Sequence, residues 1–391
     1  TAFAASGNDT IRNVENIVAG AGNDTLTGSD ADNILVGGEG DDTLEGLGGD
    51  DTLSGGDGSD TASYANATGG VTVDLAAQTA SGAAGEDTFE SIENVTGSAH
   101  ADTLSGDDGD NIIDGGVGND SLIATEGDDV LRGGSGIDTV DYGNATGGIT
   151  ADLAAGTVSG LGNDQIQGIE NLNGSDYDDT ITGGQGNNIL SGEDGDDILS
   201  GGGGNDILLG GAGDDTLSGG LGTDLIDGGD GIDTVDYSDA ESGVTLDLGT
   251  GKTDSATGDT VLNVENAIGS GLDDTITGSD ADNTILTGAG DDTINGSAGD
   301  DVIDGGAGQD VVDYSNSETG VDVDLEAGST DKADGTDLLS NIEDVIGSDA
   351  NDSIGGSDAA NTLSGGAGDD TIDGRAGDDV ISGGAGDDTL S

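Results

Sequence analysis

A nine-residue pattern, seen whole as GGAGDDTLS at residues 210–218 and again at 383–391, recurs through most of the chain. In phase with it are 27 nonapeptides of the form G-G-x-G-x-D-x-U-x, where U is aliphatic. Position eight is Leu, Ile or Val in 26 of the 27, and position six is Asp in 22 and Asn in five. Such a repeat predicts a stack of small coils, because one nonapeptide alone cannot bury its aliphatic side chain.

Four inserts divide the nonapeptides into five blocks of five, five, seven, five and five. The first 18 residues match the end of an insert, so we expect them to be the tail of a truncated insert. The predicted organisation is this tail at 1–18, block 1 at 19–63, insert 1 at 64–96, block 2 at 97–141, insert 2 at 142–173, block 3 at 174–236, insert 3 at 237–268, block 4 at 269–313, insert 4 at 314–346 and block 5 at 347–391.

The nonapeptide pattern has a direct physical interpretation. Residues seven to nine form a short strand whose middle side chain points inward, because side chains alternate along a strand. The glycine-rich first six residues form a turn, in which carbonyl oxygens and the Asp carboxylate converge. Two nonapeptides then make one coil, so that every second turn stacks on the same edge. The predicted fold class is all-β, a parallel β-roll solenoid with Ca²⁺ between stacked turns and wider β inserts.

The composition indicates that such a stack needs a cation. The chain has 83 Asp and Glu residues against five Lys and Arg, a formal charge of −78, and 2% aromatic residues. Without counter-ions this composition is typical of disorder. A divalent ion between stacked carboxylates removes charge where repulsion is greatest, and calcium accepts six or more oxygen ligands in a flexible geometry. The acidity also argues against a nucleic-acid partner, and no apolar run is long enough for membrane insertion.

Calcium ligands are predicted from the position-six carboxylates and from the glycine carbonyls of the turns. The carboxylate candidates are Asp42, Asp51, Asp60, Asp120, Asp129, Asp138, Asp197, Asp206, Asp215, Asp224, Asp233, Asp292, Asp301, Asp310, Asp370, Asp379 and Asp388. The carbonyl candidates in block 3 are Gly192, Gly195, Gly201, Gly204, Gly210, Gly213, Gly219 and Gly222. Counting stacked pairs within blocks gives up to about 17 sites, of which about seven use only the third and later nonapeptides.

The second nonapeptide of every block differs at position six. Only there is Asp replaced by Asn, at Asn33, Asn111, Asn188, Asn283 and Asn361. The first and second nonapeptides also tend to lack the full glycine pattern, which predicts weaker calcium sites in the first coils. Duplication of one ancestral segment would copy Asn whatever its role, and both explanations stay open.

Each insert opens with Tyr and closes on VEN, IEN or IED. The alternating stretch at residues 70–75, GVTVDL, predicts a strand with Val71, Val73 and Leu75 inward, and the closing segment predicts a second strand. Successive closing triplets are 78, 77, 95 and 78 residues apart, so the long spacing exceeds its shorter neighbour, 77, by one 18-residue coil. We therefore expect every insert-plus-block superrepeat to present the same face of a continuous rod.

The nonapeptides resemble the RTX, or haemolysin-type calcium-binding, repeat family, over 243 of the 391 residues. The resemblance implies parallel β-rolls that hold Ca²⁺ between turns. It also implies an extracellular bacterial protein, exported unfolded by type I secretion and folding when it meets external calcium. The chain contains no cysteine, so metal rather than disulfides is the expected source of stability.

The residue types favour a structural protein over an enzyme. The single histidine, His100, is expected in a solvent-facing loop, and the paired carboxylates have the spacing of calcium turns rather than of a glycosidase. The tyrosines that open the inserts, Tyr64, Tyr142, Tyr237 and Tyr314, are expected to pack at junctions rather than to form a sugar-binding ladder.

The function predicted from sequence is that of an extracellular, calcium-binding rod or filament at the bacterial cell surface. An adhesin stalk, a surface layer or a matrix fibre would fit, with further copies of the chain end to end or a cell surface as partners. One alternative is the calcium-binding and secretion module of a secreted toxin or hydrolase. Another is calcium-dependent binding of carbohydrate.

Overall fold

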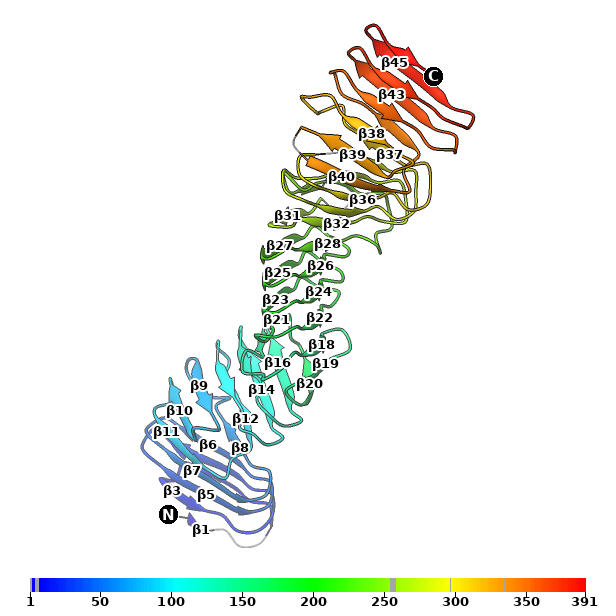
Figure 1. The fold of residues 1–391 in the computed structure, drawn as a ribbon. Coiled ribbons are helices and arrows are strands. Elements are labelled where there is room, and N and C mark those ends of the chain that lie inside the picture. Colours follow the sequence, from blue (N-terminus) through cyan, green and yellow to red (C-terminus); the bar gives the residue numbers. More distant parts are fainter. Residues whose placement is uncertain (1, 4–6, 254–257, 296, 334) are drawn as a thin grey trace. The chain divides into compact units, whose positions relative to one another are not determined.

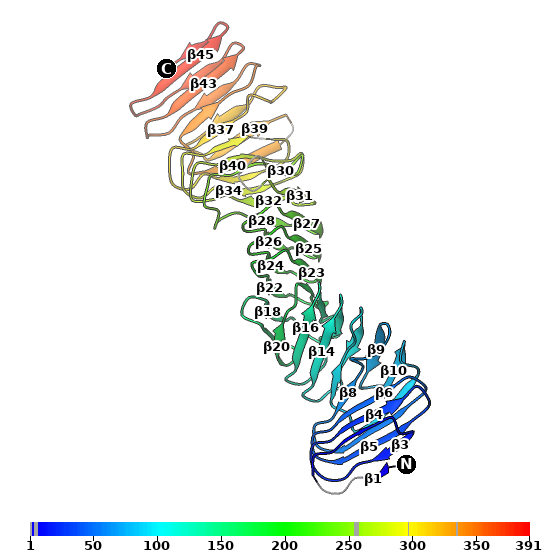
Figure 2. The ribbon, with the colours of Figure 1, turned by 180° about the vertical axis from the view of Figure 1, so that it is seen from behind.

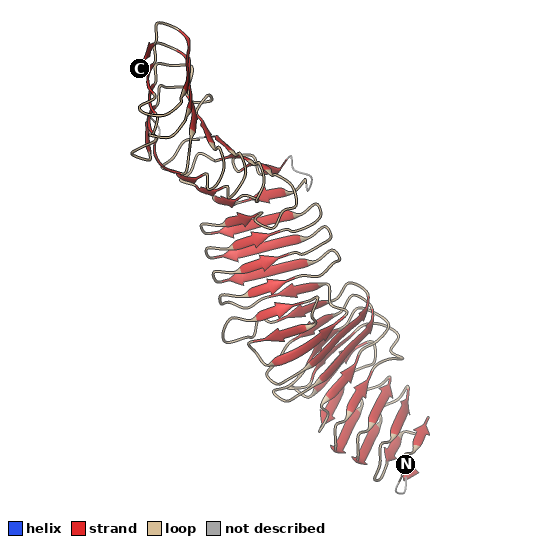
Figure 3. Ribbon diagram, turned by 90° about the vertical axis from the view of Figure 1, so that its right-hand side faces the viewer, coloured by secondary structure: helices blue, strands red, loops and turns tan. Residues whose placement is uncertain are grey.

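The computed structural model describes residues 2–3, 7–253, 258–295, 297–333 and 335–391. It comprises two compact parts, the N-terminal half Thr1–Gly195 and the C-terminal half Asp196–Ser391. Both halves consist of short strands joined by turns, and the described residues contain no helix (Figure 3).

In the N-terminal half the chain winds between two sheets. In pairing order, the first sheet contains β1 (Ala2–Phe3), β3 (Asn16–Val18), β5 (Ile34–Glu39), β7 (Thr52–Asp57), β11 (Asp87–Glu90), β10 (Thr79–Gly82), β9 (Val71–Asp74), β13 (Thr103–Ser105), β15 (Ser121–Ile123), β17 (Thr139–Asp141), β21 (Asn171–Asn173) and β23 (Ile189–Asp194). The second sheet contains β2 (Thr10–Arg12), β4 (Thr25–Ser29), β6 (Thr43–Leu47), β8 (Thr61–Ser63), β12 (Asn94–Thr96), β14 (Ile112–Val117), β16 (Val130–Ser135), β20 (Asn163–Gln167), β19 (Thr157–Ser159), β18 (Thr150–Asp152) and β22 (Thr180–Thr182).

The C-terminal half is built in the same way. Its first sheet contains β25 (Ile207–Ala212), β27 (Leu225–Asp230), β31 (Thr260–Leu262), β30 (Lys252–Thr253), β29 (Thr245–Asp247), β33 (Thr275–Thr277), β35 (Thr293–Asn295), β37 (Val311–Asp313), β41 (Asp344–Ile346), β43 (Thr362–Ala367) and β45 (Val380–Ala385). Its second sheet contains β24 (Ile198–Ser200), β26 (Thr216–Ser218), β28 (Thr234–Asp236), β32 (Asn266–Ile268), β34 (Thr284–Leu286), β36 (Val302–Asp304), β40 (Gly335–Ser340), β39 (Ser329–Lys332), β38 (Asp322–Asp324), β42 (Ser353–Gly355), β44 (Thr371–Asp373) and β46 (Thr389–Leu390).

Within a block, neighbouring strands of one sheet are parallel and one coil apart. Leu208 of β25 pairs with Ile226 of β27, and Leu217 of β26 pairs with Val235 of β28, 18 residues on in each case. Figure 1 shows β3, β5 and β7 stacked in this way in the N-terminal half, and Figure 2 shows β4, β6 and β8 of the other sheet. Two nonapeptides therefore make one coil, and the predicted parallel β-roll solenoid is confirmed.

The aliphatic residue at position eight forms the core. In block 1, Leu26, Leu35, Leu44, Leu53 and Ala62 are all 0% exposed. Successive members come from opposite sheets, because the chain crosses the roll once per nonapeptide. The result is a narrow aliphatic interior, which explains how a chain with 2% aromatic residues still buries a continuous core.

Several strands are longer than the predicted three residues. β25 and β27 each span six, continuing through the first three positions of the next nonapeptide. Gly211 pairs with Gly229 in this extension, at positive φ values of 124° and 109°. Because glycine tolerates such φ values, the chains stay paired beyond the aliphatic residue and the turn that follows is shorter.

Each insert adds a three-stranded antiparallel meander to one sheet only. In insert 1, β11 pairs parallel with β7, β10 and β9 follow antiparallel, and β9 pairs parallel with β13. Val71, Val73 and Leu75 are buried as predicted, and the closing segment contains the predicted strand, β11. The other sheet passes directly from β8 through β12 to β14. One side of the roll therefore gains two strands that the other side lacks.

Consecutive inserts in each half extend opposite sheets. In the N-terminal half, insert 1 extends the first sheet and insert 2, with β18, β19 and β20, extends the second. In the C-terminal half, insert 3 extends the first sheet and insert 4 the second. The prediction that every superrepeat presents the same face is therefore wrong. The three antiparallel strands of insert 1 stay in the first sheet, and its last strand, β12, lies in the second. The five nonapeptides that follow then alternate between the sheets and bring insert 2 to the second sheet.

Candidate calcium-binding turns

The position-six carboxylates form a hydrogen-bonded ladder along each turn edge. The backbone N–H of Asp197 donates to Asp215 Oδ1, and that of Asp215 donates to Asp233 Oδ1, each at 2.8 Å. In block 2, Asp102 donates to Asp120 at 2.9 Å and Asp120 to Asp138 at 2.8 Å. One oxygen of each carboxylate is thus fixed by the coil before it.

The second oxygen, Oδ2, faces inward in these turns. Most of these atoms are buried and accept no hydrogen bond, namely those of Asp42, Asp51, Asp60, Asp120, Asp138, Asp215, Asp224, Asp233, Asp292, Asp310 and Asp370. A buried carboxylate oxygen without a donor destabilises a fold unless a cation compensates it. Because the same atom recurs in the same place, these turns suit a positive charge and are not isolated packing faults.

In several of these turns, a carbonyl of the following coil or insert lies beside Oδ2. A Cβ at Gly115 would lie 2.5 Å from Asp120 Oδ2 and 2.7 Å from Gly133 O, so both oxygens border the same small space. In block 3, Asp215 Oδ2 and Gly228 O converge on Gly210 in the same manner. Two acceptors without a donor between them repel each other. Glycine at position one leaves this space open, and a cation between the coils would fill it.

The donor set identifies the kind of ion that fits. Within the described ranges, no three His, Cys, Asp or Glu side chains come together as a metal-binding group. Each space instead presents one carboxylate and backbone carbonyls, without the nitrogen or sulfur that zinc prefers. Oxygen ligands on flexible turns suit calcium. The Asp and Gly residues of the turns would hold the ion, and the ion would join two coils while cancelling their charge.

The predicted carboxylates all lie at the turn edges, but their surroundings differ. Asp197 and Asp206 are buried members of the ladder. Asp129 Oδ2 accepts a hydrogen bond from Thr125 Oγ1 at 3.2 Å. Asp379 and Asp388 are only half-buried. Their roles as calcium ligands stay a prediction.

The predicted glycines fall into two groups. Those at position one are buried, namely Gly192, Gly201, Gly210 and Gly219. A Cβ at Gly201, Gly210 or Gly219 would meet the Oδ2 of the carboxylate in its own turn. Those at position four are half-buried and have positive φ values, namely Gly195, Gly204, Gly213 and Gly222. The first group keeps the space open, and the second allows the tight turn around it.

In the first nonapeptide of blocks 2 to 5, a serine donates hydrogen bonds to the position-six carboxylate. Ser98 Oγ donates to Asp102 Oδ1 at 2.9 Å, and Ser98 N donates to Asp102 Oδ2 at 2.5 Å. The same hydroxyl bond recurs at Ser175, Ser270 and Ser348. Because protein donors reach both oxygens, these first turns need an ion less, which agrees with the predicted weakness of the first coils.

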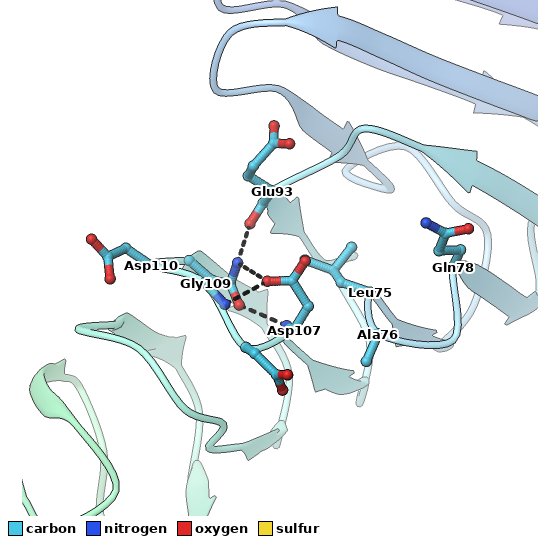
Figure 4. A pocket seen from close by; sticks show the side chains of 9 residues that line it. Leu75, Ala76, Gln78, Glu93, Asp107, Gly109 and Asp110 are labelled. Carbon is cyan, nitrogen blue, oxygen red and sulfur yellow. Dashed lines mark hydrogen bonds between the residues drawn. The ribbon is translucent and has the colours of Figure 1, made fainter.

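The Asn of the second nonapeptide has a structural role of its own. Asn111 Nδ2 donates to the carbonyl of Glu93 at 2.8 Å, while Asn111 Oδ1 accepts from Asp107 N at 2.8 Å. Figure 4 labels the two partners, Glu93 and Asp107. Asn188, Asn283 and Asn361 bond the equivalent Glu carbonyls. An ionised Asp has no proton to donate there. The structure therefore favours a role at the insert-to-block junction over simple copying.

Sequence reasoning missed that the end of each insert continues the ladder. Asp60 N donates to Glu93 Oε2 at 2.8 Å, and the carbonyl of Ser91 borders the same space as Asp60 Oδ2. The equivalent residue pairs are Gly168 and Glu170, Asn263 and Glu265, and Asn341 and Glu343. The first residue of each pair has a positive φ, 53° at Ser91. The recurring VEN, IEN or IED triplet was the available signal.

The tyrosines that open the inserts are buried, as predicted. Tyr64 OH donates to Asp87 Oδ2 at 2.8 Å, and Asp51 N donates to Asp87 Oδ1 at 2.9 Å. Burial and the nearby charge of Asp87 raise the pKa of Tyr64 well above its ordinary value, so it remains a donor. Tyr142, Tyr237 and Tyr314 make equivalent bonds to insert aspartates. Buried rings with bonded hydroxyls cannot form an exposed sugar-binding ladder.

Burial also changes the titration of the turn carboxylates. It raises the pKa of Asp215 to about 6, an effect opposed by the N–H of Asp197 and reinforced by the charge of Asp233. Asp51, Asp60 and Asp120 are raised to about 6 for the same main reason. At neutral pH these groups are ionised against a desolvation penalty, which a bound cation would offset.

His100 is exposed and lies in the turn that Ser98 closes, in agreement with its predicted loop position. No helix in the described part of the chain is long and apolar enough to cross a membrane.

The repeat geometry agrees with the comparison to known families. The profile of the RTX calcium-binding nonapeptide repeat, in four copies, matches residues 14–44, 27–62, 87–122, 96–130, 115–145, 173–208, 200–235, 268–302, 277–312 and 355–390. These ranges cover more than half of the chain, which therefore belongs to the RTX calcium-binding nonapeptide repeat family. It is a calcium-binding β-roll repeat protein.

No curated protein matches the sequence. A solved structure of a hyperactive, Ca²⁺-dependent, β-helical antifreeze protein from an Antarctic bacterium is 17% identical, with a TM-score of 0.17, and the match covers 98% of this chain and 83% of that one. A likeness at that TM-score carries no argument about function.

Proposed function

We propose that this chain is an extracellular structural repeat region that calcium stiffens, serving as an adhesin stalk, a surface layer or a matrix fibre. The observation that carries the proposal is the repeated buried Asp Oδ2 facing a carbonyl of the next coil without a donor between them. Filled by calcium, each space would link two coils. Without an ion, repulsion between the carboxylate and carbonyl oxygens favours the unfolded chain.

The arrangement of the chain supports a structural role over catalysis. The recurring polar groups form the carboxylate ladders, the hydrogen bonds at the insert-to-block junctions and the spaces suited to an ion. The single histidine is exposed. RTX repeat proteins are typically secreted, which supports a location outside the cell, where calcium is abundant. We therefore propose an extracellular or bacterial cell-surface location, without enzymatic activity, and with a cell surface or further copies of the chain as partners.

The turns also refine the proposed number of sites. The first nonapeptides of blocks 2 to 5 contribute little, because serine donors reach their carboxylates. The last nonapeptide of a block gains a partner from the insert, since the Ser91 carbonyl reaches the space of Asp60 and the Asn263 carbonyl that of Asp233. The strongest sites then run from the third nonapeptide to the closing turn of the following insert.

A calcium titration followed by circular dichroism tests the proposal. The calcium-free chain at neutral pH is expected to be largely disordered, and calcium to produce β-structure cooperatively. A chelator should reverse the change, and magnesium should act weakly because it prefers stricter geometry and retained water. A spectrum indifferent to calcium would contradict the calcium-dependent stack. Electron microscopy of the loaded chain would then test for stiff, elongated particles.

A further inference from the structure

Insert 4 contains the one lysine that is buried among the described residues. Lys332 Nζ lies 2.8 Å from Asp337 Oδ1 and 3.6 Å from Asp301 Oδ2, and it donates to the carbonyl of Ser297. The lysine and both aspartate side chains are at most 1% exposed. The ammonium also lies 5.6 Å from the centre of the Tyr314 ring. Three oxygens and an aromatic face thus surround one positive charge.

The position of this ammonium is informative because Asp301 belongs to the position-six ladder. Its equivalents before inserts 1 and 3, Asp51 and Asp224, have a buried Oδ2 that accepts no hydrogen bond. Before insert 2, the hydroxyl of Thr125 donates to Asp129 Oδ2. Only at Asp301 does a full positive charge face the same atom.

At the corresponding positions of inserts 1 and 2, the residue is a glycine, which has no side chain that could do this. Thr330 pairs with Asp337 across β39 and β40, as Ala80 pairs with Asp87 in insert 1 and Val158 with Asp164 in insert 2. Two residues further on, Lys332 therefore corresponds to Gly82 and Gly160. Tyr314 and its bond to Asp337 are common to all inserts, so the lysine is the difference.

We propose that the Lys332 ammonium permanently occupies the place of a calcium ion at the Asp301–Asp337 junction, which makes insert 4 the least calcium-dependent junction of the roll. The proposal rests on calcium filling the remaining turns. A tethered ammonium needs no external concentration to bind, so this junction stays closed when ions leave its neighbours. It would then keep neighbouring coils in register for refilling, since repeat proteins fold by nearest-neighbour contacts.

Hydrogen exchange measured by mass spectrometry along a calcium titration of the full chain tests this inference. The two amides to compare are Leu338 N, which donates to Asp301 O, and Thr88 N, which donates to Asp51 O. They occupy the same place in inserts 4 and 1. Leu338 is expected to become protected at a calcium concentration about tenfold lower than Thr88, since about 1.4 kcal/mol of extra local stability corresponds to that factor.

The variant Lys332→Met removes the charge and retains most of the apolar stem. It should move Leu338 protection to calcium concentrations at or above those of Thr88, and saturating calcium should restore it, because the ion can then enter. Lys252→Met is the matched control. Lys252 is an exposed lysine of insert 3, so its loss should leave both protection curves unchanged.

The possible outcomes separate the inference from the proposed function. If no amide responds to calcium, the calcium-dependent roll itself fails. If Thr88 and Leu338 of the wild-type chain gain protection together, only the role of Lys332 is overturned. The same holds if Lys332→Met leaves the Leu338 curve in place, or if saturating calcium cannot restore protection there while the other coils fold.

Discussion

Replacing Asp215 by Asn should change stability in opposite directions with and without calcium. The amide keeps the size of the side chain and the Oδ1 acceptor of the Asp197 N–H, but it removes the charge from the space shared with the Gly228 carbonyl. Losing one partner of a buried ion pair costs about 3–5 kcal/mol. At about 1.4 kcal/mol per factor of ten, calcium at this site should bind about 100-fold more weakly or worse.

Without calcium the same substitution removes a desolvated charge. Burial raises the pKa of Asp215 from 3.8 to about 6. At about 1.36 kcal/mol per pKa unit, its ionisation at neutral pH destabilises the calcium-free fold by up to about 3 kcal/mol. Screening by water and counter-ions at the turn edge reduces this to about 1–2 kcal/mol. Asp215→Asn should therefore stabilise the calcium-free fold by that amount.

Two titrations followed by circular dichroism measure the two effects. The calcium concentration at the midpoint of folding measures the effect of the substitution on calcium binding. For the calcium-free arm, trimethylamine N-oxide favours the compact state and brings folding into a measurable range. Asp239→Asn is the matched control, because Asp239 is an exposed insert residue and its substitution changes the net charge equally.

The reasoning would be refuted if Asp215→Asn changed the stability of the fold in the same direction with calcium and without it. Coincident curves for Asp215→Asn and Asp239→Asn would be equally damaging, because they would show that only net charge matters and that Asp215 is no ligand.

Four further predictions concern other parts of the roll. Raised carboxylate pKa values favour the calcium-free fold below pH 3.8, an advantage lost as pH rises through about 6; circular dichroism of the chelated chain should show more β-structure in mild acid than at neutral pH. Asn111→Asp should destabilise the fold by about 1–3 kcal/mol in urea unfolding, since the Glu93 carbonyl loses its amide donor. Tyr142→Phe should cost about 1–3 kcal/mol, with hydrogen exchange increasing locally, because Asp164 Oδ2 loses its donor. Leu217→Ala should cost about 2–5 kcal/mol through the cavity left in the core, and a thermal midpoint unchanged by it would contradict the assigned interior.

The sequence was sufficient to predict the core residues and the coil register, which the nine-residue period controls. The phase of the aliphatic residue placed Leu217 in the core, and the pairing of two nonapeptides gave the 18-residue register seen between Leu208 and Ile226. The position-six Asp was located on the turn edges for the same reason. These features follow from the spacing of residues within a nonapeptide, and that spacing is the same in each repeat.

Features that depend on the inserts could not be predicted in the same way. Glu93 meets Asp60 over 33 residues, and Lys332 meets Asp301 over 31, through antiparallel strands that interrupt the period. The side on which an insert lies depends on how many strands it adds to one sheet, which the alternating pattern alone does not give. The serine that closes Asp102 was visible in the sequence, but its donor role needed the turn geometry.

The carboxylate ladder gives every coil two chemically different faces. Each position-six N–H points to the carboxylate of the coil that follows, as from Asp120 to Asp138. At this edge, the position-six N–H groups face the C-terminal side of a coil, and the position-six carboxylates face its N-terminal side. Head-to-tail contact of two such rolls would bring N–H donors against carboxylates there, whereas contact of two N-terminal sides would bring carboxylates against each other. The position-six ladder therefore gives the turn edge a polarity along the roll that does not depend on calcium.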